Sequence, residues 1–550
     1  MRKTIYILFL VILPLLTFPQ VAKNNYRLYL TDKNNNDFSI SNPEEFLSAK
    51  SIQRRTNQDI SIIENDIPIS NFYLDSLKTL GLKIINKSKW LNTVVVYTSD
   101  SELIDTITKY DFVKSKYKST KNDIAESQIN LLRNNTSHLE VNASDYLDYG
   151  YGTTQISMIN GHALHQNNYK GQEITIAIID GGFLDVDILP AFDSLWYNNQ
   201  IIGTRDFVDR DNQVFDASSH GMKVLSTMGA NLPGKLIGTA PKANYWLLRS
   251  EKTDDEYTIE EDNWVAAAEF ADSVGADIIS SSLGYSEFDD DTQNYTYSDM
   301  DGNTTHITKG ADLAASKGII VVSSAGNLGD DAWKYISAPG DGDSVLTVGA
   351  VDAYATLAYF SSLGPTYDGR IKPNVCAMGY QTSVQGLDGN ITVANGTSFS
   401  APIIAGMAAC LWQYYPELSN MDIIQKIEES AHQYSKPDNF MGYGIPDFAK
   451  AAGLQSTNTT SIIKNEAFVK SYPNPFYNNL IVEITLKHIE SVTIELYNST
   501  GSKVREKEFE SNSPFTKTKL NNLSDLPHGI YFIKIKIGNQ QIVKTLSKVY

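Results

Sequence analysis

The sequence has 550 residues, of which 42% are hydrophobic and 20% charged, so it can form several globular domains and is not disordered throughout. A formal net charge of -18 argues against binding of nucleic acid, because a phosphate-binding surface needs an excess of cations. The charge is uneven: residues 23–121 carry 15 basic and 12 acidic side chains, residues 122–460 carry 17 and 44, and residues 461–550 carry 12 and 8. These shifts indicate three regions.

The N-terminus is typical of an exported protein. A basic head, Met1-Arg2-Lys3, precedes an apolar run at 5–18, which predicts a signal peptide over residues 1–22. This run is shorter than the roughly 20 residues that span a membrane. We expect a soluble mature protein. The two cysteines, Cys376 and Cys410, do not form a disulfide scaffold, and the sequence leaves open whether they pair.

Residues 23–121 are predicted to form a small α+β domain. Strand patterns at 26–30 and 93–97 alternate with helical patterns at 72–80 and 101–110, and a further strand completes the order β-α-β-α-β. A polar stretch at 122–149 follows, and we expect it to be a linker or processing region.

Residues 150–453 are predicted to form an α/β domain with a mainly parallel sheet. Short apolar, β-branched runs alternate with helical patterns, at 174–179, 243–248, 276–280, 318–323 and 345–348. Strands with so few polar residues are buried on both faces, which predicts helices on both sides of the sheet in a three-layer α/β/α arrangement.

The C-terminal part is predicted to be an all-β sandwich. A small polar linker at 454–464 precedes residues 465–550, where alternating segments at 480–486, 492–497 and 530–537 are separated by Asn, Gly and Pro turns.

Three polar residues of the middle domain are candidates for catalysis. Asp180 ends an apolar strand, His220 begins a predicted helix, and Ser398 follows a turn at Gly396 and lies at a helix N-terminus. Taken singly, each has an ordinary explanation as a turn or cap residue or a packed histidine.

Their order along the chain, Asp, His, Ser, is the order of the subtilisin triad. Around them, Ile178-Ile179-Asp180-Gly181-Gly182, His220-Gly221 and Gly396-Thr397-Ser398 resemble the three motifs of the subtilisin-like serine peptidases, the S8 family. The resemblance covers residues 150–453. It implies that His220 deprotonates Ser398 while Asp180 orients the imidazole.

Two further stretches carry the resemblance. Ser323-Ser324-Ala325-Gly326-Asn327 is similar to the family's oxyanion-hole motif, which implies that Asn327 stabilises the oxyanion together with the Ser398 backbone N–H. Ser281-Ser282-Leu283-Gly284 is similar to the segment that binds the peptide substrate. The implied substrate-binding residues are Ser281, Ser282, Leu283, Gly284, Ser324, Ala325 and Gly326.

The chain departs from the family pattern in three places. Gly181 and Met222 stand where the family usually has threonine, which affects packing or rate but not the reaction class. An acidic insertion between Gly284 and Gly310, with Asp residues at 289–291, 299 and 301, borders the substrate cleft, binds structural Ca²⁺ or is a solvated loop; the sequence leaves these alternatives open. It does not fit the EF-hand, whose twelfth position would fall on Gly310 instead of glutamate.

The two ends resemble accessory domains of secreted enzymes. Residues 23–121 are similar to the inhibitory propeptide of secreted subtilases, and their positive charge should speed association with the acidic middle domain. We expect the cut between residues 119 and 149. The segments at 472–476, 526–532 and 543–546 resemble the C-terminal sorting domain of type IX secretion substrates, which implies export by that machinery and release or attachment at the outer surface of a Gram-negative cell. An ordinary carbohydrate-binding sandwich is the alternative.

The sequence thus predicts a secreted serine endopeptidase acting on proteins or peptides as a monomer, with no cofactor needed for the chemistry. The alternative is a catalytically inactive adhesin or binding protein on the same fold. No H-E-x-x-H or G-x-S-x-G motif occurs, which disfavours a metallopeptidase and an α/β-hydrolase esterase.

Overall fold

The computed structural model describes residues 24–120, 147–253, 255–454, 468–485, 491–510, 515–538 and 540–549. The chain divides into two compact units, residues 1–456 and 457–550. The predicted signal peptide, most of the segment 122–149 and the linker at 454–464 lie outside the described residues, apart from Leu454. Within the described residues, no helix combines the length and the apolar character needed to cross a bilayer.

The middle of the first unit is a seven-stranded sheet with the order β13-β12-β11-β10-β5-β9-β6, in which all neighbours are parallel. Its strands are β5 (Thr175–Asp180), β6 (Ile201–Asp206), β9 (Asn244–Arg249), β10 (Ile278–Ser281), β11 (Ile320–Ser324), β12 (Val345–Val351) and β13 (Val375–Met378). All five predicted strands are present. β6 and β13 were not predicted.

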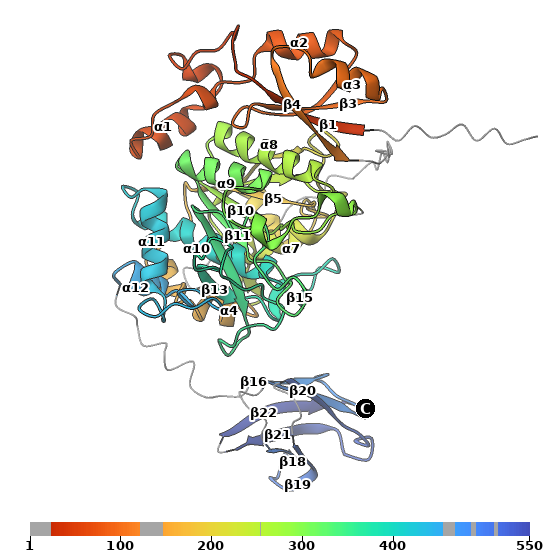
Figure 1. Ribbon diagram of the computed structural model, residues 1–550. Helices are drawn as coiled ribbons and strands as arrows, with labels where there is room; N and C mark the ends of the chain where they lie inside the picture. The colour runs from red at the N-terminus through yellow and green to blue at the C-terminus, as the bar shows by residue number, and fades with distance from the viewer. Residues whose placement is uncertain are drawn as a thin grey trace, which may run out of the picture. The chain divides into compact units, whose positions relative to one another are not determined.

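Helices cover both faces of this sheet, as the predicted three-layer arrangement requires (Figure 1). They are α4 (Thr153–Ser157), α5 (His162–Gln166), α6 (Asp193–Tyr197), α7 (His220–Gly229), α8 (Ile259–Val274), α9 (His306–Ser316), α10 (Thr397–Tyr414), α11 (Asn420–Ser430) and α12 (Phe448–Ala451). Two short hairpins pair β7 (Asn231–Leu232) with β8 (Leu236–Ile237) and β14 (Thr382–Gln385) with β15 (Ile391–Ala394).

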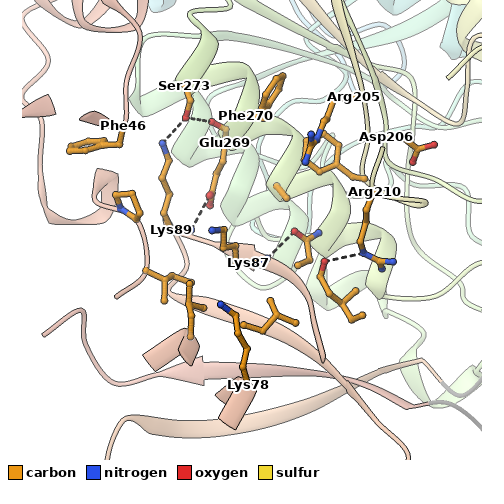
Figure 2. A pocket seen from close by; sticks show the side chains of 18 residues that line it. Phe46, Lys78, Lys87, Lys89, Arg205, Asp206, Arg210, Glu269, Phe270 and Ser273 are labelled. Atoms are coloured by element: carbon orange, nitrogen blue, oxygen red, sulfur yellow. Dashed lines mark hydrogen bonds between the residues drawn. The ribbon is translucent and has the colours of Figure 1, made fainter. Parts of the chain in front are cut away.

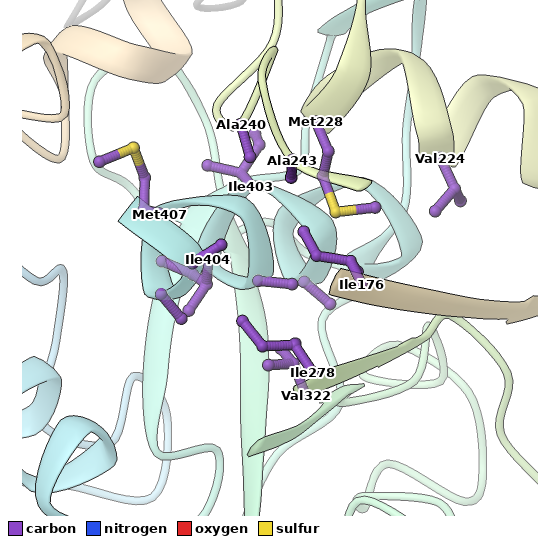
Figure 3. Close-up of a cluster of buried hydrophobic side chains, with 14 of the residues drawn as sticks. Ile176, Val224, Met228, Ala240, Ala243, Ile278, Val322, Ile403, Ile404 and Met407 are labelled. Carbon is purple, nitrogen blue, oxygen red and sulfur yellow. The ribbon is translucent and has the colours of Figure 1, made fainter. Parts of the chain in front are cut away.

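Alternate residues of β5 enter two different cores, which explains why this strand carries almost no polar residue. Ile176 and Ile178 pack in the core under α7 and α10, whereas Ala177 and Ile179 pack in the core under α8 and α9. Figure 3 shows the first core, where Ile404 of α10 lies on the side of Ile278 and Val322, and Ile403 lies on the side of Ala240 and Ala243. Cys376 and Cys410 are buried and unbonded to each other, which settles the question that the sequence left open.

Residues 24–120 form a four-stranded antiparallel sheet with the order β2-β3-β1-β4. Its strands are β1 (Asn24–Leu30), β2 (Lys83–Ser88), β3 (Thr93–Thr98) and β4 (Val113–Thr120), and its helices are α1 (Ala49–Asn57), α2 (Asn71–Thr79) and α3 (Ser101–Ile107). The α+β class matches the expectation. β2 and α1 were not predicted, because polar and charged residues interrupt the patterns of both.

The N-terminal sheet packs against α8 of the middle domain through buried charges (Figure 1). Asp272 of α8 is fully buried and lies 2.5 Å from Arg54 Nη2 and 2.8 Å from Arg55 Nη1. Arg27 of β1 lies 2.5 Å from Asp262, and Glu269 accepts the backbone N–H groups of Lys89 and Trp90. Figure 2 shows this side of α8, with Lys89 reaching Ser273.

The second unit contains two antiparallel sheets that share one core, as predicted for a sandwich. One sheet has the order β16-β17-β20 and the other β19-β18-β21-β22. The strands are β16 (Phe468–Tyr472), β17 (Leu480–Thr485), β18 (Ser491–Asn498), β19 (Lys503–Glu510), β20 (Phe515–Leu520), β21 (Gly529–Ile537) and β22 (Gln540–Lys548).

The buried charges between α8 and the N-terminal domain lead to a first prediction. Asp272→Asn should weaken docking of residues 24–120 by about 3–5 kcal/mol, because it leaves Arg54 buried without its anion and Arg55 with Asp66 alone. Amide hydrogen exchange of β1–β4 in the full chain should accelerate accordingly. Asp75→Asn is the matched control, since Asp75 is exposed and pairs only with Lys78, and it should change stability by less than about 0.5 kcal/mol. Equal exchange in both variants would contradict the prediction.

Candidate active site

The site lies where the strand order of the sheet changes direction. β5 has β9 on one side and β10 on the other. From β5 the chain runs to the half of the sheet that contains β6 and β9, whereas from β10 it runs to β11, β12 and β13 in the opposite half. In open parallel sheets, such a switch point leaves a crevice beyond the carboxyl ends of the strands. Asp180 ends β5, Ser282 follows β10 and Asn327 lies shortly after β11, so all three lie at this edge.

Asp180 is fully buried, and hydrogen bonds compensate its carboxylate. Its Oδ1 accepts the Gly181 N–H at 2.8 Å. His220 Nδ1 lies 2.8 Å from Oδ1 and 3.0 Å from Oδ2. Because a carboxylate only accepts, Nδ1 carries the proton and Nε2 is left as the basic nitrogen of the neutral ring.

His220 is the first residue of α7, and its ring packs against Phe399 with 5.8 Å between the ring centroids. Burial alone would lower the pKa of His220, but the charge of Asp180 and the hydrogen bond to it raise the pKa above its usual value. The following Gly221 permits this approach. A Cβ there would lie 2.5 Å from the Gly182 carbonyl oxygen and 3.0 Å from Asp180 Cβ.

Ser398 lies in the first turn of α10, after Gly396 at φ 147°. It is 7% exposed, and its Oγ donates to the Ser282 carbonyl at 3.3 Å. Among the hydrogen bonds of the described residues, none joins Ser398 to His220. At 3.3 Å the bond to Ser282 is long for an O–H donor, and catalytic hydrogen bonds commonly tighten only when substrate is present.

Asn327 is held by the residue that precedes Ser398. Its Oδ1 accepts the backbone N–H of Thr397 at 2.8 Å and the Thr397 hydroxyl at 3.0 Å. These two bonds fix the amide plane, so that the Nδ2 group is the part of the side chain available to a ligand. An amide N–H beside a helix N-terminus can stabilise negative charge.

The predicted residues meet in one cavity of about 620 Å³. The predicted residues that line this cavity are Asp180, His220, Ser282, Leu283, Gly284, Ser324, Gly326, Asn327 and Ser398. The structure does not place Ser281 and Ala325 in the lining. Both are fully buried behind it, and Ser281 Oγ accepts the indole N–H of Trp264.

The cavity also contains acidic residues beyond the predicted site residues. Glu251, Glu256 and Glu287 line it. Glu287 belongs to the acidic insertion that was expected to border the cleft or to bind Ca²⁺, whereas sequence reasoning missed Glu251 and Glu256. Burial and the charge of Asp180 raise the pKa of Glu251. The end of β9, two residues before Glu251, was the available signal, because polar residues after parallel strands face the ligand crevice.

The acidic insertion uses several of its carboxylates within its own turns, whereas Asp289 accepts the backbone N–H of Glu256 at 3.2 Å and Glu287 lines the cavity. Asp290 accepts from Thr292, Asp299 from Thr296, and Asp301 from Asn303 and Thr304. Ca²⁺ binding there remains a prediction. Within the described parts of the chain, the carboxylates grouped closely enough to hold a metal ion are those of Glu251, Glu256 and Glu260.

Comparison with known proteins identifies all three regions. Residues 171–444 match the Subtilase family, residues 25–137 the Peptidase S8 propeptide domain of Bacteroidota, and residues 470–548 the secretion system C-terminal sorting domain.

Among characterised relatives, the thermophilic serine proteinase of Bacillus sp. (strain AK1) is 30% identical over 350 residues, covering 61% of this chain and 77% of that protein. Subtilisin DY of Bacillus licheniformis is 28% identical over 279 residues, which is 50% of this chain and 90% of the relative. Subtilisin NAT of Bacillus subtilis subsp. natto is 29% identical over 301 residues, with 54% and 70% covered. The chain belongs to the subtilase family and is a subtilisin-like serine endopeptidase with a propeptide domain and a C-terminal sorting domain.

Proposed function

We propose that the enzyme cleaves peptide bonds through Asp180, His220 and Ser398, with Asn327 as an oxyanion-hole residue. The observation that carries this proposal is the 2.8 Å hydrogen bond between His220 Nδ1 and Asp180 in a cavity that Ser398 and Asn327 also line. A rotation about the Cα–Cβ bond of Ser398 would turn Oγ from Ser282 toward the cavity.

In the proposed reaction, His220 Nε2 removes the proton of Ser398 Oγ as the oxygen attacks the substrate carbonyl. Asp180 keeps the imidazole in the required tautomer and stabilises the imidazolium. Asn327 Nδ2 and the Ser398 backbone N–H stabilise the oxyanion. His220 then protonates the leaving amine, and water hydrolyses the acyl-enzyme with the same base. Side chains carry every proton, so the chemistry requires no cofactor.

The two flanking domains suggest how the enzyme is controlled and exported. We propose that residues 24–120 inhibit the enzyme until they are removed by a cut between residues 119 and 149, most of which lies outside the described residues. Their buried ion pairs with α8 support tight docking. The sorting domain supports export by the type IX machinery, with release or attachment at the outer surface of a Gram-negative cell.

The assignment of the nucleophile is tested by Ser398→Ala. This change should abolish peptide hydrolysis and labelling by a fluorophosphonate probe, because the probe reacts with an activated serine. Ser400→Ala is the control on the same helix, since Ser400 Oγ donates to the Thr397 carbonyl and does not line the cavity. Persistent activity in Ser398→Ala would refute the proposal. Absence of labelling in the natural chain, after proper folding and maturation, would favour an inactive binding protein.

The pairing of His220 with Asp180 predicts a specific pH dependence. Activity needs neutral His220, so kcat/KM should fall as pH decreases through its pKa. Because Asp180 raises that pKa, Asp180→Asn should move the acid limb to lower pH and reduce kcat by about 10⁴. Profiles of kcat/KM against pH for both proteins provide the measurement. An acid limb that stays in place would show that another group controls it.

The role of Asn327 predicts a change in kcat with little change in KM. Asn327→Ala should lower kcat by about 10²–10³, because the lost donor acts on the transition state. Asn327→Asp is the matched variant: it keeps an acceptor for Thr397 but lacks the donor, and it should lose at least as much. Full activity in Asn327→Asp would assign this side chain a structural role only.

A further inference from the structure

One wall of the catalytic cavity is strongly acidic. Glu251, Glu256 and Glu287 line it, and neither Lys nor Arg is among the described residues that do. Asp180 adds a carboxylate beside the neutral ring of His220, so the acidic groups of the lining have no basic side chain to offset them. A cavity lined by one sign of charge concentrates ligands of the opposite sign.

Three carboxylates converge at this wall. One oxygen each from Glu251, Glu256 and Glu260 lies within 4.8 Å of the others. Glu251 accepts the Tyr285 hydroxyl at 3.1 Å, and one oxygen of Glu260 accepts the Lys252 backbone N–H at 2.7 Å. The nearby ammonium group of Lys252 pairs instead with Asp255.

Glu260 has an oxygen without a partner. Glu260 is 3% exposed, and its Oε2 makes no hydrogen bond within the described structure. Glu260 does not itself line the cavity, but it lies directly behind Glu251 and Glu256, which do. A buried carboxylate oxygen is normally paired, so the exception beside these two residues points to a missing donor.

The carboxylates of this cluster also oppose one another's ionisation. Burial, and then the neighbouring acidic groups, raise the pKa of Glu256 to about 8. The pKa of Glu260 is raised by the same two effects. A cation placed among the carboxylates would satisfy Oε2 and remove the repulsion.

A peptide chain already passes this wall. The hydroxyl of Thr258, a residue between Glu256 and Glu260 in the sequence, donates to the Ser119 carbonyl of β4 at 3.2 Å. Gln293 Nε2 donates to the Lys118 carbonyl at 2.9 Å. Extended peptide backbone is therefore accommodated beside the three glutamates.

We propose that Glu251, Glu256 and Glu260 form a subsite for a Lys or Arg side chain of the peptide substrate, close to the scissile bond. The inference rests on the proposed function and adds a substrate class to it. An organic cation fits better than Ca²⁺, which takes six to eight oxygen ligands, because one oxygen of Glu260 and one of Glu251 already accept the Lys252 N–H and the Tyr285 hydroxyl. Lys and Arg bring three and five N–H donors.

The test compares quenched fluorescent peptides that differ only by Lys or norleucine at one position, scanned over the residues on each side of the scissile bond. The enzyme is purified from cells that express the full chain, and its active sites are titrated first with a fluorophosphonate. Reactions run with EDTA and, separately, with CaCl₂. The variants are Glu256→Gln and Glu260→Gln, and Glu417→Gln is the charge-matched control, because Glu417 is exposed and does not line the cavity.

We expect kcat/KM to favour Lys over norleucine by about tenfold at one position, and this ratio to fall toward one in both cluster variants but not in Glu417→Gln. Glu256 is partly exposed, so Glu256→Gln keeps the test valid if Glu260→Gln unfolds. If the natural enzyme is labelled by the probe but shows no preference for Lys, the subsite inference is overturned while the proposed function stands. The same holds if the cluster variants keep the preference. A calcium-dependent rate that is lost in the variants would also overturn the inference, because the cluster would then hold a metal. Failure to label at all would contradict the proposed function instead.

Discussion

The parallel pairing of β5 with β9 and β10 is the constraint on which the site depends. Parallel strands end at the same edge, and the connections that leave the neighbours β5 and β10 run to opposite halves of the sheet, so this edge stays open at its centre. Asp180 is placed there by the rigid end of a strand that is buried on both faces. α7 and α10 begin at the same edge, which brings His220 and Ser398 to Asp180 although they are distant in sequence.

Buried charge serves two different purposes in the first unit. At the catalytic edge, Asp180 is matched by His220 within one domain, so the pair persists whatever else is bound. On α8, Asp262 and Asp272 are matched by arginines from the N-terminal domain. Such pairs add little net stability compared with apolar packing, yet they are costly to break singly, so they select one docking orientation.

Much of this arrangement was predictable. Strands buried on both faces have nearly continuous apolar sequences, which is why all five predicted strands of the middle sheet, β5 among them, are present. β6 is an edge strand with Ile202 exposed, and its mixture of polar and apolar residues hides it. β13 has only four residues, and β2 combines two adjacent isoleucines with four polar residues. For these strands, neighbours distant in sequence decide the structure.

The site was predictable to the extent that its residues sit in local motifs. Each of the four predicted residues lies at or shortly after the end of a strand or at the start of a helix, and such positions can be recognised from a local sequence pattern. These residues are Asp180, His220, Asn327 and Ser398. The cluster of three carboxylates could not be found in this way. Glu251, Glu256 and Glu260 come together only when the loop after β9 folds back on α8. The burial of Ser281 and Ala325 likewise depends on how helices pack over the ends of β10 and β11, which no local pattern reveals.

The charged face of α8 also bears on the direction of maturation. While the connection is intact, the N-terminal domain is held beside α8 at an effective concentration of the order of millimolar, which favours the pairs of its arginines with Asp262 and Asp272. If the chain is cut as proposed, the same contact becomes an encounter between two molecules, and water can hydrate the carboxylates that the separated domain exposes. Dilution would then make the proposed activation effectively one-way and would leave α8 as an anionic surface of the free enzyme.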